Sequence, residues 1–418
     1  MLPAGLSAQM TLHDCLLYAK EHAHENVINR LENRKAQLDK RIAASSLMPY
    51  VSFSTNGNVS FGRNIDPETN TYDNRRTLST GFSLGMSLPL FDGLVSVNNL
   101  KAARVAELRK VAATQIAEDQ ISLNVVKAFY NVSYCKAMVE QMRDQLRRDS
   151  IDLATTVRQE QLGAKSGADV AEMQALVATD RYELTNQENL LSKAYLNLRG
   201  LMGMELTSEP LDLAEDDEAD RVNAYNTVHP RVAEAELALR VSVLNLRAAR
   251  GAYSPKISLN AGISTSYYRM LGDAAEVPSF KEQWHNNMGQ YIGVSFSLPI
   301  FTGFSTTNRL KRAKVEMSQS RERLEQTIYE VEKETAEARL DYLASSEEMQ
   351  AAASRLDAEE IAYRAVRRKF EIGSASALDL YASGAKLATA RANYEGKRIQ
   401  KIINGITLDY FNGKKIID

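Results

Sequence analysis

The residues best suited to chemistry are few and scattered in this sequence. Its five histidines are His13, His22, His24, His229 and His285. His22 and His24 are close, but a spacing of two residues puts them on different faces of a helix, so we expect no metal site. No nucleophile motif, phosphate-binding loop or pair of catalytic carboxylates stands out. We therefore expect neither an enzyme nor a cofactor.

Two aspartates occupy matching positions in the two halves of the chain. Asp169 lies three residues after Ser166, and Asp379 lies three residues after Ser376. This is the spacing of a capping box with Asp in place of Glu, in which the serine and the acid satisfy N–H groups at a helix start. Capping is the simplest interpretation of both aspartates.

Composition excludes several classes of protein. The 418 residues include 51 Lys and Arg against 53 Asp and Glu, so the balance is not that of a nucleic-acid-binding protein. Tryptophan and proline are scarce, which favours long helices. No stretch reaches the roughly 18 apolar residues of a membrane-spanning helix, whereas the short alternating strands of a barrel stay open. The two cysteines, Cys15 and Cys135, give no support for a disulfide or a thiolate metal site.

One short sequence motif occurs twice in the chain. "SLPLFDG" ends at Gly93 and "SLPIFTG" ends at Gly303, identical at five of seven positions. The same shift of 210 residues superimposes further residues of the two halves, among them Gly163 on Gly373 and Gly203 on Gly413. We interpret this as an internal duplication.

The expected organisation is a signal-peptide remnant or disordered start at 1–10, a first repeat at 11–209, an equatorial linker at 210–226 and a second repeat at 227–418. The acidic run at 213–221 could hold a cation, but a solvated linker is the simpler interpretation.

Each half carries two segments with apolar residues at every second position, which predicts strands at about 50–63, 77–88, 256–269 and 288–298. Val51, Phe53 and Val59 share one face, while serine, asparagine and glycine fill the other. Each run is about 11 residues long, enough for a tilted strand to cross a bilayer. A small, neutral polar face suits a wet lumen with the apolar face towards lipid. The alternative is a soluble sheet packed on a core.

Prolines bound these strands because proline cannot donate to the ladder. Each strand pair is followed by an aromatic residue and a glycine. The candidate strand-to-helix junctions are Pro49, Pro89, Phe91, Gly93, Pro255, Pro299, Phe301 and Gly303.

Two helices are too long for a compact domain. No proline occurs from 90 to 209 or from 300 to the end, so we expect long helices at about 93–162 and 303–372, each about 105 Å long. Asp92 and Thr302 are suited to capping them. Apolar residues from Ile121 to Leu146 repeat with the 3.5-residue period of coiled coils, and Cys135 lies on this stripe. Return helices are expected at about 167–203 and 377–412, and leading helices at about 11–47 and 227–253.

Four strands cannot close a barrel, and an open edge is prohibitive in lipid. The strands must therefore come from several chains. Two chains give eight strands, which side chains normally fill, whereas three give twelve, which leave a lumen.

The duplicated strand pair and long helical hairpin, the two Pro-aromatic-Gly junctions and the G-x-x-S-x-x-D turns together resemble the TolC-like outer-membrane efflux proteins, or outer membrane factors. The resemblance covers about 11–413. It implies a mainly α fold with a membrane β-barrel: a homotrimer with a twelve-stranded barrel in the outer membrane on a twelve-helix coiled-coil α-barrel in the periplasm. The implied function is the passive, gated channel-tunnel of a tripartite efflux or type I secretion system. The implied partners are a periplasmic adaptor, an inner-membrane RND or ABC transporter and outer-membrane lipid.

The resemblance also implies sites. In the family, acidic residues after the second hairpin turn ring the periplasmic mouth; Asp379 matches that position and Asp169 is its counterpart. Carboxylates converging on an axis would raise each other's pKa and attract cations. The family often has a second acid one turn later, where this chain has Ala382. Adaptor docking is expected at the hairpin turns, although tight turns need small residues in any case. These turns contain Gly163, Ala164, Lys165, Ser166, Gly373, Ser374, Ala375 and Ser376.

Two other functions remain open. A stand-alone, porin-like channel would need no long periplasmic rods. A soluble structural coiled coil would not need strands with a serine- and glycine-rich face.

Overall fold

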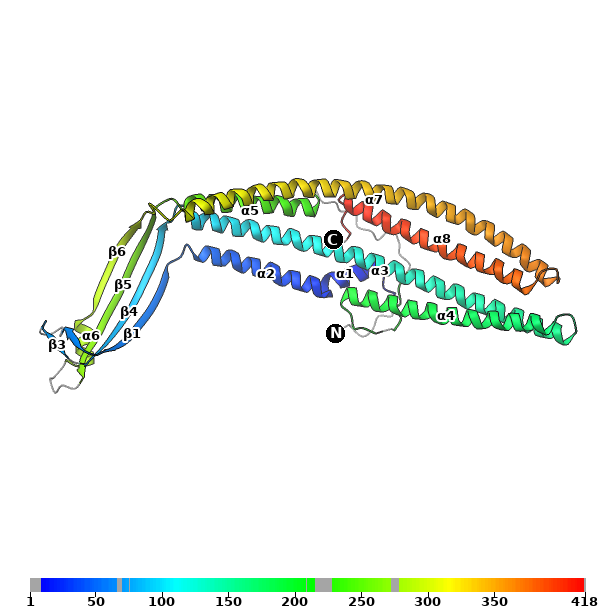
Figure 1. Cartoon of the computed structure of the whole chain (residues 1–418), viewed down its shortest axis with the longest axis horizontal. Helices are drawn as coiled ribbons and strands as arrows, with labels where there is room; N and C mark the ends of the chain where they lie inside the picture. The colour runs from blue at the N-terminus through cyan, green and yellow to red at the C-terminus, as the bar shows by residue number, and fades with distance from the viewer. Residues whose placement is uncertain are drawn as a thin grey trace. The chain divides into compact units, whose positions relative to one another are not determined.

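A computed structural model describes residues 9–65, 70–74, 76–207, 209–214, 228–271 and 278–416 (Figure 1). Most of the expected start segment 1–10 and most of the expected linker 210–226 lie outside these residues. The chain forms two compact units that interleave in sequence. Unit 1 comprises Met1–Asn33, Lys110–Glu234 and Glu325–Asp418, and unit 2 comprises Arg34–Arg109 and Ala235–Leu324. Each unit thus contains parts of both expected repeats.

Unit 2 contains a four-stranded antiparallel sheet in the order β1-β4-β5-β6. Its strands are β1 (Tyr50–Ser60), β4 (Arg76–Phe91), β5 (Lys256–Leu271) and β6 (Gly289–Ser297). β4 and β5 pair across the two halves of the sequence and form the centre of the sheet. β1 and β6 are therefore its edges.

The sheet differs from expectation at Pro89. β4 continues past its expected end at 88 to Phe91, and its register with β5 shifts between Pro89 and Phe91. A bulge tolerates proline because the ladder is interrupted there and the missing N–H leaves no partner unsatisfied. In the second half β6 ends at Ser297, before Pro299.

Two further elements, a short hairpin and a short helix, lie almost wholly between the expected strands. β2 (Arg63–Ile65) and β3 (Tyr72–Asn74) form a short hairpin, and α6 (Phe280–Asn286) is a short helix. α6 covers the edge of β5 beyond its last partner on β6, at Ser264. The side chain of Gln283 accepts from the Tyr268 N–H at 2.9 Å and donates to the Tyr268 carbonyl at 2.9 Å. The Gln283 side chain thus satisfies both backbone groups of Tyr268 at a position where β5 has no partner strand.

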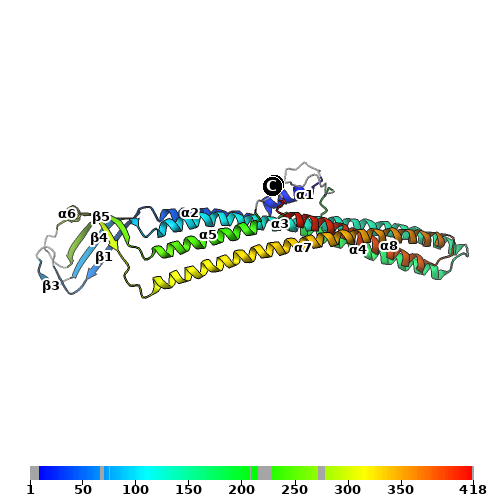
Figure 2. The ribbon, with the colours of Figure 1, turned by 90° about the horizontal axis from the view of Figure 1, so that it is seen from above.

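The helices that connect to the sheet follow the order of the strands, with α5 (Pro230–Gly251) between α3 (Val95–Gln161) and α7 (Ser305–Glu371) in Figure 2. α3 and α7 each have 67 residues, which is about 100 Å of helix. α4 (Gly167–Met202) and α8 (Ala377–Phe411) return from their ends. None of the described helices is long and apolar enough to cross a membrane.

The first expected helix, about 11–47, is broken. α1 (Leu12–His22) and α2 (His24–Ser45) are separated by Ala23, whose ψ of 128° is extended. Asn26 stabilises the break by donating from Nδ2 to the Ala19 carbonyl at 3.1 Å. Gly203 packs so closely here that a Cβ on it would lie 2.5 Å from the His22 carbonyl oxygen. The break arises from this tertiary contact, which helical periodicity does not reveal.

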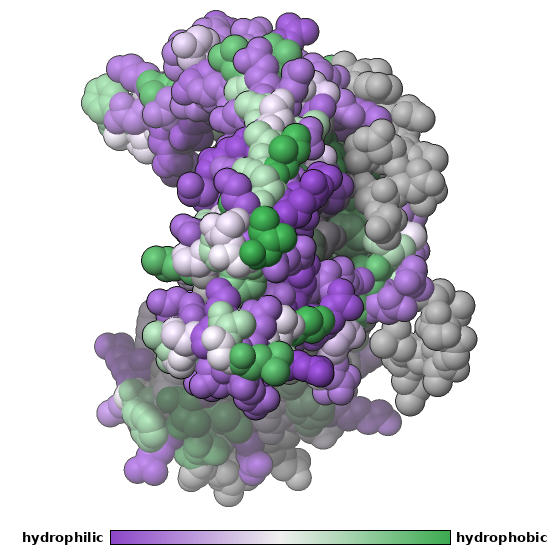
Figure 3. All heavy atoms as spheres, turned by 90° about the vertical axis from the view of Figure 1, so that its right-hand side faces the viewer, coloured by the Kyte–Doolittle hydropathy of each residue, from purple (hydrophilic) through white to green (hydrophobic). Residues whose placement is uncertain are grey.

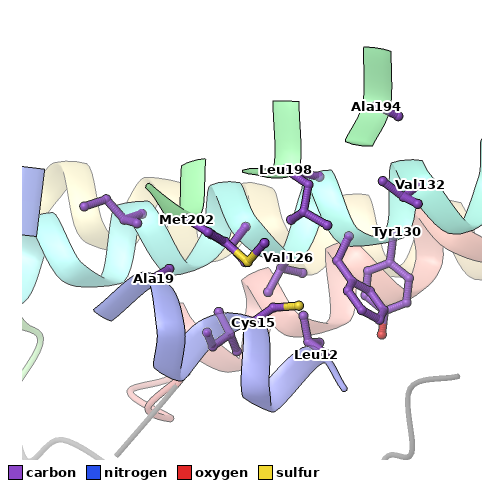
Figure 4. Packing of buried hydrophobic residues seen from close by; sticks show 14 of the residues in the cluster. Leu12, Cys15, Ala19, Val126, Tyr130, Val132, Ala194, Leu198 and Met202 are labelled. Carbon is purple, nitrogen blue, oxygen red and sulfur yellow. The ribbon is translucent and has the colours of Figure 1, made fainter. Parts of the chain in front are cut away.

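The core of unit 1 lies where α1, α3 and α4 meet (Figure 4). Leu198 and Met202 of α4 are fully buried against Val126 of α3 and Cys15 of α1. The expected stripe on α3 is buried from Ile121 to Val139 and includes Cys135, which is a free, packed thiol as expected. Cys15 is also free and buried.

The duplication is visible in the backbone angles. Left-handed glycines recur at a spacing of 210 residues, at Gly93 and Gly303, Gly163 and Gly373, and Gly203 and Gly413. Leu94 and Phe304 also match, each with φ of 63°. A positive φ is uncommon for any residue with a Cβ, so its presence at equivalent positions reflects a shared local requirement.

Candidate functional site

The sheet has two chemically distinct faces because the strand register places apolar residues opposite apolar residues and small polar residues opposite small polar residues. Phe53 lies opposite Leu84, which lies opposite Ile263. One residue along, Ser54 lies opposite Ser83, with their hydroxyl oxygens 2.7 Å apart, and Ser83 lies opposite Ser264. On the edge strands the apolar face is open: Phe53 and Phe296 are each 65% exposed. Such a sheet can have lipid on one face and water on the other.

The strand-to-helix junctions repeat one design. Asp92 accepts the Ser96 N–H at 2.8 Å, and Thr302 accepts the Thr306 N–H at 3.4 Å. Both side chains therefore bond to the helix start as expected of caps, although they reach the residue four positions on. Pro49 and Pro255 precede β1 and β5, while Pro299 and Phe301 follow β6.

The two junctions differ in how closely their glycines approach other described residues. A Cβ on Gly93 would lie 2.1 Å from the Gly251 carbonyl oxygen, whereas a Cβ on Gly303 would meet nothing within 4 Å. Gly251 is the last residue of α5, so the start of α3 and the end of α5 approach each other backbone to backbone.

The two hairpin turns, both in unit 1, are also built alike. The Gly163 N–H donates to the Glu160 carbonyl at 2.8 Å and the Ala164 N–H to the Gln159 carbonyl at 2.8 Å, which satisfies the end of α3. In the second turn the Ser374 N–H donates to the Lys369 carbonyl at 2.8 Å. Gly373 and Ser374 are exposed, and Ala375 is half-buried. From the hairpin end the visible surface is mainly hydrophilic with scattered apolar residues (Figure 3).

Asp169 and Asp379 form the capping boxes. The Asp379 carboxylate accepts the Ser376 N–H at 3.0 Å and its hydroxyl at 2.8 Å, while the Asp379 N–H donates back to that hydroxyl at 3.1 Å. Asp169 and Ser166 make the same three bonds. In both cases hydrogen bonds from the serine lower the pKa of the aspartate. Within one chain the carboxylates are thus held in the charged form.

Sequence reasoning missed a pair of buried carboxyl groups in the first hairpin. Asp149 of α3 and Asp180 of α4 are both buried, and Gln145 donates to Asp149 at 2.6 Å. Burial, with a smaller contribution from Asp149, raises the pKa of Asp180 to about 7. A signal was available: Asp149 lies three residues after Leu146 and so continues the apolar stripe.

Two cationic contacts near the turns were also missed. Lys165 Nζ lies 5.2 Å from the centre of the Phe370 ring, which links the first turn to the end of α7. Arg367 of α7 lies 3.6 Å from the half-buried Asp152 of α3. Both contacts join residues more than 200 positions apart, and no local pattern marks them.

Comparison with known proteins identifies the family. The profile of the outer membrane efflux protein family matches residues 28–204 and 226–413. The cation efflux system protein CusC of Escherichia coli (strain K12) is 23% identical over 370 residues, which are 86% of this chain and 77% of CusC. The outer membrane protein TolC of Vibrio cholerae is 24% identical over 373 residues, 87% of this chain and 82% of TolC.

Solved structures share the fold. VceC of Vibrio cholerae superimposes with a TM-score of 0.78 at 15% identity, covering 96% of both chains. A structure of CusC superimposes with a TM-score of 0.80 at 20% identity, covering 98% of this chain and 95% of CusC. The chain is located in the outer membrane, with its helical part in the periplasm. It is the outer-membrane component of an efflux system and belongs to the outer membrane efflux protein family.

Proposed function

We propose that three copies of this chain assemble into a duct through which an efflux or secretion system exports its cargo. Each copy contributes four strands to a twelve-stranded barrel and its helices to a twelve-helix α-barrel. The two repeats, 11–209 and 227–418, each supply one strand pair and one hairpin. The duct is passive: it carries out no reaction.

The open edges of the sheet are the observation that carries this proposal. β1 and β6 each pair on one side only among the described strands. Unpaired backbone groups in lipid cost several kcal/mol each, so strands that lie in a bilayer must close into a barrel. Twelve strands leave an open lumen, whereas eight are filled by side chains. The column of serine and glycine residues on one face of the sheet suits such a lumen.

Light scattering of the detergent-extracted protein tests the assembly. We expect a protein mass of three times 46.5 kDa after subtraction of the detergent. A monodisperse monomer would refute closure between chains, and a dimer would replace twelve strands by eight. In planar bilayers the trimer should give discrete conductance steps.

The proposed partners are a periplasmic adaptor and an inner-membrane transporter of the RND or ABC class. A relative from Pseudomonas putida, TtgC, is named a probable efflux pump outer membrane protein, which supports a pump as the source of cargo. The exposed turns at Gly163–Ser166 and Gly373–Ser376 are the proposed docking points. A photo-crosslinking residue at Ser374 should capture an adaptor, whereas the same residue at the exposed Arg41 of α2 should not. Equal capture at both positions would remove the turns from the docking surface.

Asp379, and its counterpart Asp169, are proposed to narrow the periplasmic mouth in addition to capping their helices. Asp379→Ala should raise single-channel conductance and weaken block by cations. Ser376→Ala is the matched control, because it breaks the capping box but keeps the carboxylate. If the two variants behave alike, Asp379 only caps α8.

A further inference from the structure

α3 and α5 form a groove in unit 2, next to the sheet. It has a volume of about 540 Å³, which is within the size range of small-molecule sites. α3 contributes two cations and one valine, and α5 contributes two cations and three apolar residues. The lining residues are Lys101, Arg104, Val105, Leu239, Arg240, Val243, Leu244 and Arg247.

The four cations of this groove are not ion-paired with any described acid. None of them makes an ion pair or a side-chain hydrogen bond with any residue that the structure describes. The nearest acid along α3, Glu107, is paired with Lys40 of α2 at 2.6 Å. By contrast, a smaller cavity in unit 1, between α3, α7 and α8, has Arg391 in its lining, and this arginine is ion-paired with Glu360 at 2.8 Å. These four exposed cations line one groove and repel one another, which favours an anion among them.

The surrounding helices strengthen this field. In unit 2 the helical segments 34–45, 95–109, 235–251 and 305–324 hold sixteen lysines and arginines but only five aspartates and glutamates. The whole chain is nearly neutral, with a net charge of −2. Positive charge is therefore concentrated on the helices beside the sheet, which raises the local concentration of anions.

The apolar side chains decide what kind of anion fits. On α5, Val243 lies three residues after Arg240 and Leu244 lies four after, so cations and apolar side chains share one face of the helix. An inorganic anion would use only the charges. We propose that this groove is a binding site for an anionic amphiphile, a molecule with a phosphate, carboxylate or sulfonate head on an apolar body.

Two sources could supply such a molecule. Lys101 lies six residues after the start of α3, about 9 Å along the helix, and Arg247 lies four residues before the end of α5. The headgroup layer of a bilayer is about 5–8 Å thick, so an anionic phospholipid at the periplasmic surface would be near these residues. The other source is an exported amphiphile. The site needs only one chain, so it does not depend on the proposed trimer.

Native mass spectrometry of the complete detergent-extracted protein tests the proposal. The probes are dioleoyl phosphatidylglycerol as the anionic lipid, dioleoyl phosphatidylethanolamine as the lipid without net charge, and cholate as the soluble anionic amphiphile. The groove variant is Arg104→Gln with Arg240→Gln. The matched control is Arg41→Gln with Arg250→Gln, which removes two exposed arginines of the same unit outside the groove.

We expect saturable binding of at least one anionic probe, with the Kd raised at least tenfold in the groove variant and less than twofold in the control. Phosphatidylglycerol alone would identify a lipid site, and cholate binding would identify a cargo-like site. No saturable binding, equal binding of phosphatidylethanolamine or equal weakening in both variants would overturn the proposal. The same spectra report the oligomeric state. A monomer that binds the anion would refute the proposed trimer but support the anion site.

Discussion

Replacing Gly93 by alanine should destabilise the protein more than replacing Gly303, although the two glycines occupy matching positions at the junctions. Both have a left-handed backbone, with φ of 74° and 60°. Alanine in that conformation costs about 1–2 kcal/mol at either site. The two sites differ in what the new methyl group would touch.

At Gly93 the methyl group would lie 2.1 Å from the Gly251 carbonyl oxygen and 2.6 Å from Ser254 Cβ. Ordinary contact needs more than 3 Å, so the backbone must move by about 1 Å, and overpacking of this kind costs about 1–3 kcal/mol. At Gly303 nothing lies within 4 Å. We therefore expect losses of about 2–5 kcal/mol for Gly93→Ala and about 1–2 kcal/mol for Gly303→Ala.

Urea unfolding of the detergent-extracted variants, followed by circular dichroism at 222 nm, measures the difference. Gly251→Ala should also destabilise the protein, because its methyl group would lie 2.3 Å from the Gly93 carbonyl oxygen. Its loss should be limited to the overpacking part, about 1–3 kcal/mol, since Gly251 does not have a left-handed backbone. The double variant should lose less than the sum of the two, since one backbone shift relieves both contacts. If Gly93→Ala costs no more than Gly303→Ala, the close approach of α3 and α5 does not constrain this junction.

Three further outcomes are expected. Leu198→Ala should cost about 2–5 kcal/mol in the same urea assay, since Leu198 is fully buried in the core of unit 1; a loss below 1 kcal/mol would contradict that packing. Asp180→Asn should stabilise the protein at pH 8 but not at pH 4. The pKa of Asp180 is raised in the folded protein, so the wild type loses stability as pH rises from about 4 to about 7. If the pH dependence of stability is the same in the variant and the wild type, this pair is not buried as described. Burial raises the pKa of the Cys15 thiol to about 12 and also raises that of Cys135, so a maleimide at pH 8 should label neither in the folded protein and both in urea.

The faces of the sheet could be predicted because a strand has a fixed period of two. Once Phe53 and Leu84 are assigned to apolar faces, pairing them in register follows from keeping all apolar residues on one side. The long helices could be predicted because proline is absent and the stripe from Ile121 to Leu146 is regular. The choice of three chains over two rests on the family resemblance and stays a prediction.

The features that were missed depend on contacts between distant residues. The break at Ala23 is set by Asn26 and by Gly203, which is 180 residues away. α6 forms where β5 outlasts its partner strand, and the length of a partner strand is not a local property. The Asp149–Asp180 pair joins two helices whose relative rotation is fixed by packing. In each case the local sequence allows the feature but does not specify it.

Comparison of the two junctions separates a local requirement from a packing requirement. Leu94 and Phe304 share a φ of 63°, although only the first junction packs against α5, so the left-handed pair belongs to the strand-to-helix turn itself. The second junction lies at the edge of the sheet, after β6. Its apolar side chains are open: Ile300 is 92% exposed, Phe301 74% and Phe304 67%. Within its own chain this turn has few contacts, among them the Phe301–Phe304 ring pair and the hydrogen bond from the Tyr253 hydroxyl to Thr307. The proposed assembly through β6 and β1 accounts for this asymmetry, because it would leave the first junction interior to each copy and turn the second towards the next copy.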